Sequence, residues 1–339
     1  MKAAILYGAR DLRVEERDLD SDALGPNQLY VETLVSALST GTDLGNYLGD
    51  SNYVPDAPDY PRQVGYSNVG VVRKVGSAVT QFRPGQRIFS RHYHQSAFIA
   101  GDDEVLTPIP DGVPDDEASL AYLTHLGLAG IRQAKYETGE NVAVVGLGII
   151  GLCTVGLARA MGAKVVAISN SPKRSAAALK MGAHAAVEYR DPSLGDCLAR
   201  VFGEEGTDLV ILTANPWPAY RLSVDIARTG GRISILGFPG RFDEPPDFNP
   251  LDPRWFYAKQ LTLLGSGSAP STDAPASDLR FNIRRNLQYI MTLLANRDMR
   301  FDSLITHRFP PERMKEAYEL AREHSKDLIA AVFDWAQED

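Results

Sequence analysis

The feature that most constrains the fold is a glycine-rich turn between an apolar run and a helical one. The run NVAVV leads into GLGIIG, and the helical period IIGLCTVGLARAMG follows with small residues on one face. Further apolar runs (AKVVAIS, TDLVILTA, GRISILGF, LTLLGS) then alternate with helical periods. Near-continuous apolar strands that alternate with helices predict an α/β fold built on a doubly wound parallel sheet.

The turn has the spacing GxGxxG, which is typical of dinucleotide binding when a strand precedes it and a helix follows. Gly146 permits the tight turn, Gly148 lets the backbone approach a pyrophosphate, and Gly151 allows close packing of helix on strand. The first N–H groups of the helix, from Ile149 and Ile150 onward, are expected to bind the phosphates. The alternative is a tight turn without a ligand, which the β-α-β series that follows makes less favourable.

The end of the second strand of this series indicates which cofactor would bind. An NAD site usually has an acidic residue there for the ribose hydroxyls, whereas this strand runs into SNSPKR. Hydroxyl, amide and cationic groups favour the extra phosphate of NADP(H). The expected phosphate-binding residues are Ser169, Asn170, Ser171, Lys173 and Arg174. The alternative is that the two cations are merely exposed side chains of a helix that Ser171 caps.

Composition excludes several other classes of protein. The chain has 339 residues, a net charge of -8 and a pI of about 5.4, so no basic surface for nucleic acid is expected. No apolar stretch approaches the roughly 20 residues that span a bilayer, and the first residues lack the pattern of a signal peptide. We therefore expect no membrane partner and a cytoplasmic location. Cys153 and Cys197 are the only cysteines, too few for a four-cysteine zinc site.

The pattern changes along the chain divide it into three parts. Short strand-like runs such as Gln28–Ser36 and Val69–Val75 fill the first third. The tail carries an amphipathic helix, a strand, a second helix and a closing strand, which are expected to pack on the first domain. The expected boundaries are 1–118 for a β-rich domain, 119–275 for the cofactor domain and 276–339 for the returning segment.

Several motifs resemble those of the medium-chain dehydrogenase/reductase superfamily along nearly the whole chain. They are MKAAILYG, STGTD (Ser39–Asp43), VGYSNVGVVRKVG (Val64–Gly76), FRPGQRI, ETGENVAVVGLGIIG and KDLIAAVFD. The resemblance implies a GroES-like β-rich catalytic domain, a Rossmann cofactor domain, a small-molecule substrate and a homodimer paired through LTLLGS (Leu261–Ser266).

The same motifs depart from the zinc enzymes of that superfamily at each ligand position. Thr40 stands where STGTD would carry a cysteine, Tyr66 where a histidine is usual, and Tyr122 near the third ligand. Zinc takes Cys, His or carboxylate ligands. The resemblance is therefore to a zinc-lacking branch, and no metal is expected.

The resemblance also implies which side chains would act on a substrate. Tyr66 and Tyr122 would face the nicotinamide, where a phenol can donate a hydrogen bond or a proton to a developing oxyanion. Thr40, at the first ligand position, is a further catalytic candidate. Thr42 matches the hydroxyl that relays a proton in the zinc relatives. His125 could be a base or a helix-buried histidine, and the two tyrosines could instead be aromatic walls of the pocket.

We therefore expect a zinc-independent NADP(H) oxidoreductase that acts at a hydroxyl or carbonyl carbon. One alternative is a quinone or enoyl reductase of the same fold, although those enzymes usually carry an Asn near Thr40–Asp43, and this chain does not. Another is a non-catalytic NADP(H)-binding sensor or structural protein, because a fold alone does not determine function.

Overall fold

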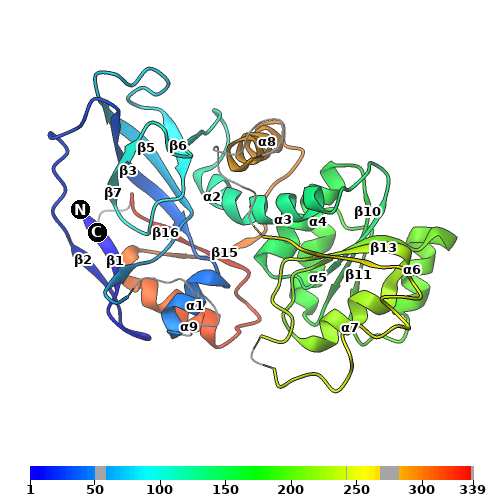
Figure 1. Cartoon of the computed structure of the whole chain (residues 1–339). Coiled ribbons are helices and arrows are strands. Elements are labelled where there is room, and N and C mark those ends of the chain that lie inside the picture. Colours follow the sequence, from blue (N-terminus) through cyan, green and yellow to red (C-terminus); the bar gives the residue numbers. More distant parts are fainter. Residues whose placement is uncertain (50–58, 242, 268–281, 337–339) are drawn as a thin grey trace. The chain divides into compact units, whose positions relative to one another are not determined.

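The computed structural model describes residues 1–49, 59–241, 243–267 and 282–336 (Figure 1). The chain divides into two compact units. The β-rich unit comprises Met1–Tyr122, Pro270–Arg297 and Ile305–Asp339, and the parallel-sheet unit comprises Leu123–Ala269 and Asp298–Leu304.

The parallel-sheet unit contains one six-stranded sheet in the order β11-β10-β9-β12-β13-β14, with every neighbouring pair parallel. The central strand β9 is the first of the series, so the order reverses beside it, as in Rossmann folds. Its strands are β9 (Asn141–Val145), β10 (Lys164–Ser169), β11 (Ala185–Glu188), β12 (Thr207–Leu212), β13 (Ala227–Ile235) and β14 (Thr262–Gly265).

Helices cover both faces of this sheet because alternate strand residues point to opposite sides. One core joins Val145, Ile168 and Leu212 of the strands to Phe202 of α6 and Tyr220 of α7. α4 and α5 contact each other and strands β9 to β11, and neither helix contributes to that core. The helices are α3 (Ala121–Gln133, which begins in the β-rich unit), α4 (Ile149–Ala160), α5 (Pro172–Lys180), α6 (Leu194–Phe202), the 3-10 turn η1 (Gly203–Glu205) and α7 (Trp217–Ile226).

The β-rich unit contains a three-stranded sheet, β2-β1-β4, and a seven-stranded sheet in the order β15-β16-β3-β5-β6-β8, in which β7 pairs with β3. Strand β3 alternates between buried and half-buried residues over most of its length, the period of a strand with one face in a core. The strands are β1 (Lys2–Leu6), β2 (Leu12–Glu16), β3 (Gln28–Ala37), β4 (Arg62–Gln63), β5 (Asn68–Val75), β6 (Arg87–Ser90), β7 (Ala97–Gly101), β8 (Thr107–Pro108), β15 (Ile305–Phe309) and β16 (Ala330–Asp334).

Short helices pack on these sheets, and α1 lies against α9 (Figure 1). Their shared core includes Tyr47, Tyr318 and Phe333, all of them fully buried. The helices are α1 (Thr42–Leu48), α2 (Asp115–Ser119), α8 (Ile283–Ala295), the 3-10 turn η2 (Pro311–Arg313) and α9 (Met314–Arg322). None of the helices described is long and apolar enough to cross a membrane.

The tail returns to the β-rich unit, where β16 pairs antiparallel with β3. The unit limits differ from the expected 118/119 and 275/276 boundaries by a few residues. The segment Asp298–Leu304 groups with the parallel-sheet unit. We had expected all of 276–339 to belong to the catalytic domain. The reason is packing: Met299 lies against Gly156 of α4, and Phe301 is completely buried.

Candidate functional site

The glycine turn between β9 and α4 leaves no room for larger side chains at two of its positions. Gly146 has a φ of 97°, and a Cβ added there would lie 2.7 Å from the backbone nitrogen of Ala214. A Cβ at Gly151 would lie 2.0 Å from the carbonyl oxygen of Gly146. At Gly148, by contrast, a Cβ would meet nothing within 4 Å. The turn is therefore closely packed at Gly146 and Gly151 and open at Gly148.

The start of α4 keeps its N–H groups available. Gly148 is the N-cap and provides no side-chain hydrogen bond to the helix, and Ile149 and Ile150 form its first turn. Thr213, which follows β12, fixes the turn because its hydroxyl donates to the carbonyl oxygen of Gly146 at 2.8 Å. The sequence did not single out Thr213; the only signal was its position directly after the strand next to β9. These residues fit a dinucleotide.

Strand β10 ends at Ser169, and α5 begins just after it. The Ser169 hydroxyl accepts the N–H of Ser171 at 3.1 Å, and Ser171 caps α5 by accepting the N–H of Arg174. Both hydroxyls can still donate their own hydrogen to an anion. Asn170 and Lys173 are exposed, whereas Arg174 is partly buried, and burial lowers the pKa of its guanidinium. The predicted N-cap at Ser171 with Pro172 in the first turn is confirmed.

A cluster of hydroxyl groups lies in the β-rich unit around Tyr66. The phenol of Tyr66 donates to the Ser39 hydroxyl at 2.5 Å and also bonds the side chain of Thr42, the first residue of α1. The Tyr122 ring meets the Tyr66 ring edge-on, with 5.3 Å between centroids. Ser39 is buried and Thr42 is exposed, so the cluster connects the interior of the unit with solvent.

Burial raises the pKa of Tyr66 well above its ordinary value of 10.0, and the carboxylate of Asp43 adds to this effect. The hydrogen bonds with Ser39 and Thr42 act in the opposite direction without cancelling it. Tyr66 therefore stays protonated and can donate a hydrogen bond throughout the neutral pH range.

Asp43 fixes the backbone on both sides of this cluster. Its buried carboxylate accepts the N–H of Ser39 at 2.9 Å and the N–H of Gly65, next to Tyr66, at 3.1 Å. The ring of His94 lies beside it, with Nε2 3.6 Å from the carboxylate. A Cβ at Gly65 would lie 2.6 Å from that ring, so only glycine fits there.

A second chain of contacts orients His94. Trp335 Nε1 can only donate, and it donates to the Ser36 hydroxyl at 2.9 Å. Ser36 lies 2.8 Å from His94 Nδ1 and has its hydrogen left for that nitrogen. The other ring nitrogen, Nε2, faces Asp43.

The two remaining predicted catalytic residues, Thr40 and His125, are less exposed than Thr42. Thr40 is half-buried in the turn before α1. His125 is completely buried within α3, which is the structural alternative that the sequence left open. The sequence motif STGTD contained Ser39, but nothing in the pattern showed that its hydroxyl would meet Tyr66.

Three positions of this chain correspond to the zinc ligands of the zinc enzymes that it resembles, and their side chains do not fit a zinc ion. Thr40, Tyr66 and Tyr122 offer hydroxyl and phenol groups, whereas zinc takes thiolate, imidazole or carboxylate ligands. Both carboxylate oxygens of Asp43 already accept backbone N–H groups. Among residues 1–49, 59–241, 243–267 and 282–336, no three His, Cys, Asp or Glu side chains gather where they could hold a metal.

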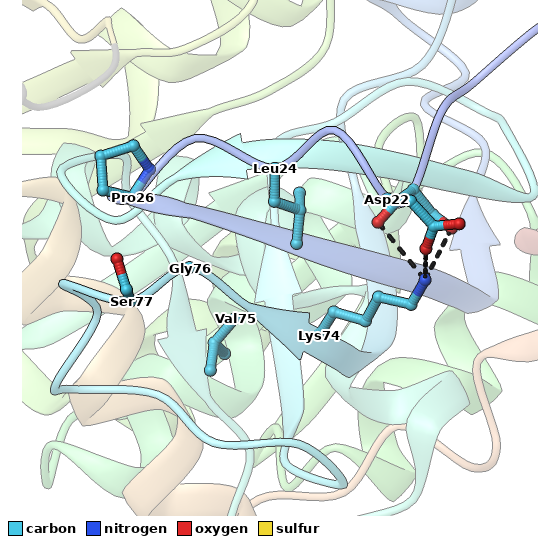
Figure 2. A pocket seen from close by; sticks show the side chains of 8 residues that line it. Asp22, Leu24, Pro26, Lys74, Val75, Gly76 and Ser77 are labelled. Atoms are coloured by element: carbon cyan, nitrogen blue, oxygen red, sulfur yellow. Dashed lines mark hydrogen bonds and ion pairs between the residues drawn. The ribbon is translucent and has the colours of Figure 1, made fainter.

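A surface hollow of about 470 Å³ in the β-rich unit is a different feature (Figure 2). Lys74 reaches across it, but its ammonium already bonds Asp22 at 2.5 Å and the Ser21 hydroxyl at 3.0 Å. The hollow shares no lining residue with the Tyr66 cluster. We assign it no part in the chemistry.

Comparisons with known proteins agree with this architecture. A family profile described as zinc-binding dehydrogenase matches residues 150–281. The L-threonine 3-dehydrogenase of Mesorhizobium japonicum is 26% identical over 343 residues, which cover 92% of each chain.

Two solved structures share the fold. A protein from Sinorhizobium meliloti 1021 that is described as a zinc-binding dehydrogenase and is bound to NADP has a TM-score of 0.78 and 22% identity, covering 98% of each chain. A short chain alcohol dehydrogenase from E. coli CFT073 in complex with NADH has a TM-score of 0.79 and 18% identity, covering 98% of this chain and 99% of that one.

The chain is therefore similar to dehydrogenases in sequence and shares the fold of these two solved structures. The expected Rossmann sheet and β-rich domain are confirmed. The profile begins at residue 150, after Thr40, Tyr66 and Tyr122. Its zinc-binding description therefore does not bear on the side chains at those positions.

Proposed function

We propose that the chain is an NADP(H)-dependent oxidoreductase that transfers a hydride between the nicotinamide and a hydroxyl or carbonyl carbon of a small molecule, without catalytic zinc. The observation that carries the proposal is the 2.5 Å hydrogen bond between the Tyr66 phenol and the Ser39 hydroxyl, at a position where zinc relatives hold a metal ligand.

The chemistry requires a proton as well as a hydride. A bound nicotinamide supplies or accepts the hydride. In the direction of reduction, Tyr66 donates its proton to the carbonyl oxygen, and the hydroxyls bonded to it can replace that proton. Thr42 is exposed and provides the link to solvent. In the direction of oxidation, the same groups take up the proton of the alcohol.

The β10–α5 turn supports NADP(H) over NAD(H). Ser169, Asn170 and Ser171 replace the acidic residue that would bind the ribose hydroxyls of NAD. Lys173 and Arg174 add positive charge in the first turn of α5. Glu188, the neighbour of Ser169 on β11, is exposed, so water screens its charge.

The donor set around Tyr66 supports zinc independence, because a phenol and two hydroxyls bind hydrogen-bond acceptors better than they bind zinc. The edge strand β14 supports a homodimer, since within the described residues it pairs only with β13.

The test begins with metal-free protein, titrated with NADPH and with NADH, followed by a panel of carbonyl compounds and alcohols in excess chelator. We expect at least tenfold tighter binding of NADPH and turnover that the chelator leaves unchanged. Preference for NADH would contradict the interpretation of Ser169–Arg174. Activity that only added zinc restores would contradict the role given to Tyr66.

A further inference from the structure

A cation lies beside the Tyr66 cluster and has no role in the chemistry proposed above. The guanidinium of Arg91 sits over the ring of Tyr122, 4.8 Å from its centroid. Tyr122 in turn meets Tyr66 edge-on at 5.3 Å. These two distances keep Arg91 within about 10 Å of the Tyr66 ring.

The fold of the β-rich unit fixes this placement. Strand β6 ends at Ser90, which pairs with Asn68 at the start of β5, so Arg91 leaves the sheet beside the segment that carries Tyr66. The chain then crosses that segment. Asn68 donates from its amide to the carbonyl of Tyr93 at 3.0 Å, and the N–H of His94 donates to the carbonyl of Val64 at 2.8 Å.

Two side chains that lie close to Arg91 in the sequence, Arg87 and His92, have carboxylate partners. Arg87 pairs with Asp115 at 2.6 Å, and His92 pairs with Glu104 at 3.0 Å while its ring stacks on Phe98. The His92 contact lowers the pKa of the Glu104 carboxyl. In the described part of the chain, no carboxylate lies within ion-pair distance of Arg91, which stays exposed.

The charge of Arg91 is therefore left for a ligand, in a chain whose net charge is -8. The aromatic face beneath the guanidinium holds its plane without using its N–H donors. A planar fork of N–H donors matches the oxygens of a carboxylate or a phosphate, and it is fixed close to the proposed proton donor.

We propose that Arg91 binds the carboxylate or phosphate group of a small anionic substrate and thereby determines which carbonyl compounds are reduced beside Tyr66. This inference rests on the proposed function and deepens it. The substrate class is a small acid or phosphate ester whose anionic group lies a few bonds from the reacting carbon.

The experiment compares charged and neutral members of two carbonyl pairs with NADPH: levulinate with methyl levulinate, and dihydroxyacetone phosphate with dihydroxyacetone. KM and kcat are measured for the wild type, Arg91→Gln and the control Arg83→Gln, which changes an exposed arginine of the same unit. NADPH binding by each variant shows that it is folded.

We expect the wild type to prefer one charged member, and the pair that shows the preference identifies a carboxylate or a phosphate. Arg91→Gln should raise the KM for that compound about 10- to 100-fold and change the KM for its neutral partner less than twofold. Arg91→Lys should restore part of the preference, because it keeps the charge but not the fork. Arg83→Gln should match the wild type.

Turnover of the neutral members alone, or an equal effect of Arg91→Gln on both members of a pair, would overturn this inference and leave the proposed function standing. No NADPH oxidation with any of the four compounds or with the wider carbonyl panel would instead overturn the proposed function, and this inference with it.

Discussion

At the scale of single residues, the chemistry depends on one phenol held between two hydroxyls. Tyr66 bonds Ser39 on its buried side and Thr42 on its exposed side. Asp43 anchors the backbone of Ser39 and of Gly65, so the cluster does not depend on side-chain contacts alone. A donor that is fixed in this way loses little entropy when a substrate binds.

The first prediction concerns Tyr66→Phe. We expect kcat to fall about 100-fold or more while NADPH binding is unchanged, because the substitution removes the donor but keeps the ring. Steady-state kinetics and a cofactor titration measure the two effects. Tyr93→Phe changes an exposed tyrosine of the same unit and serves as the control. If the Tyr66→Phe enzyme kept its activity, a group other than Tyr66 would have to be the proton donor.

The pH dependence of the wild type gives the second prediction. The pKa of Tyr66 is raised above 10.0, so the phenol keeps its proton as the pH rises to 10 and beyond. A pH–rate profile should therefore show no alkaline loss of activity from this group below pH 10. An alkaline limb near pH 8 that disappears in Tyr66→Phe would contradict the assignment.

At the scale of elements, the β9–α4 turn should tolerate almost no added volume. Gly151→Ala would place a Cβ 2.0 Å from the carbonyl oxygen of Gly146, so the turn must shift. We expect NADPH binding at least tenfold weaker and a lower Tm. The matched control is Gly195→Ala in α6, where a Cβ meets nothing within 4 Å. That change should be neutral or stabilising, since Ala favours a helix by about 1 kcal/mol over Gly. Equal effects of the two substitutions would contradict this account.

A carboxylate on α9 ties α1 to the N-terminal strands. Glu319 accepts hydrogen bonds from Tyr47, from Arg10 at 3.0 Å and from Arg322 at 2.5 Å. Burial alone would raise the pKa of Glu319, but these hydrogen bonds outweigh it and lower that pKa to about 2. Burial, together with the bond to Glu319, raises the pKa of Tyr47 to about 12.

This network predicts that part of the free energy of unfolding is lost in acid. The folded-state pKa of Glu319 lies below the ordinary 4.5, so its contribution is complete above pH 4.5 and is lost as the pH falls towards 2. We expect Glu319→Gln to remove about 1–3 kcal/mol at pH 7 and to flatten the stability profile between pH 4.5 and 2. Urea unfolding over this range measures both effects. Glu323→Gln, at an exposed partner of Arg322, is the control. A Glu319→Gln profile parallel to that of the wild type would exclude this role.

At the scale of the whole molecule, β14 forms one edge of the six-stranded sheet. Open edges tend to pair with another strand, and a two-fold axis would pair β14 with its copy. We expect a homodimer of about 74 kDa, twice the 37.0 kDa of the chain, by light scattering at micromolar concentration. A mass of 37.0 kDa under those conditions would contradict the dimer.

Local features were predictable from the sequence, and contacts between distant segments were not. The GxGxxG turn and the Ser171 cap depend on neighbouring residues, so their patterns are visible in the sequence. The Ser39–Tyr66 bond joins residues 27 positions apart, and its formation depends on how β3 and β5 are placed. The same holds for Arg91 over Tyr122, and for Met299 against α4, which places 298–304 with the other unit.

The pairing of β16 with β3 also has a consequence during synthesis on the ribosome. Val332 and its partner Ala37 are about 300 residues apart. At usual translation rates, roughly 15 to 60 s therefore pass between the synthesis of β3 and that of β16. The strands of the parallel sheet all emerge within that interval and can assemble first. β7 already pairs with the first half of β3, but until the codons for β16 are read the segment Val35–Ala37 lacks its β16 partner and is open to chaperones and proteases. A chain that stops before β16 would leave this end of β3 without that partner permanently.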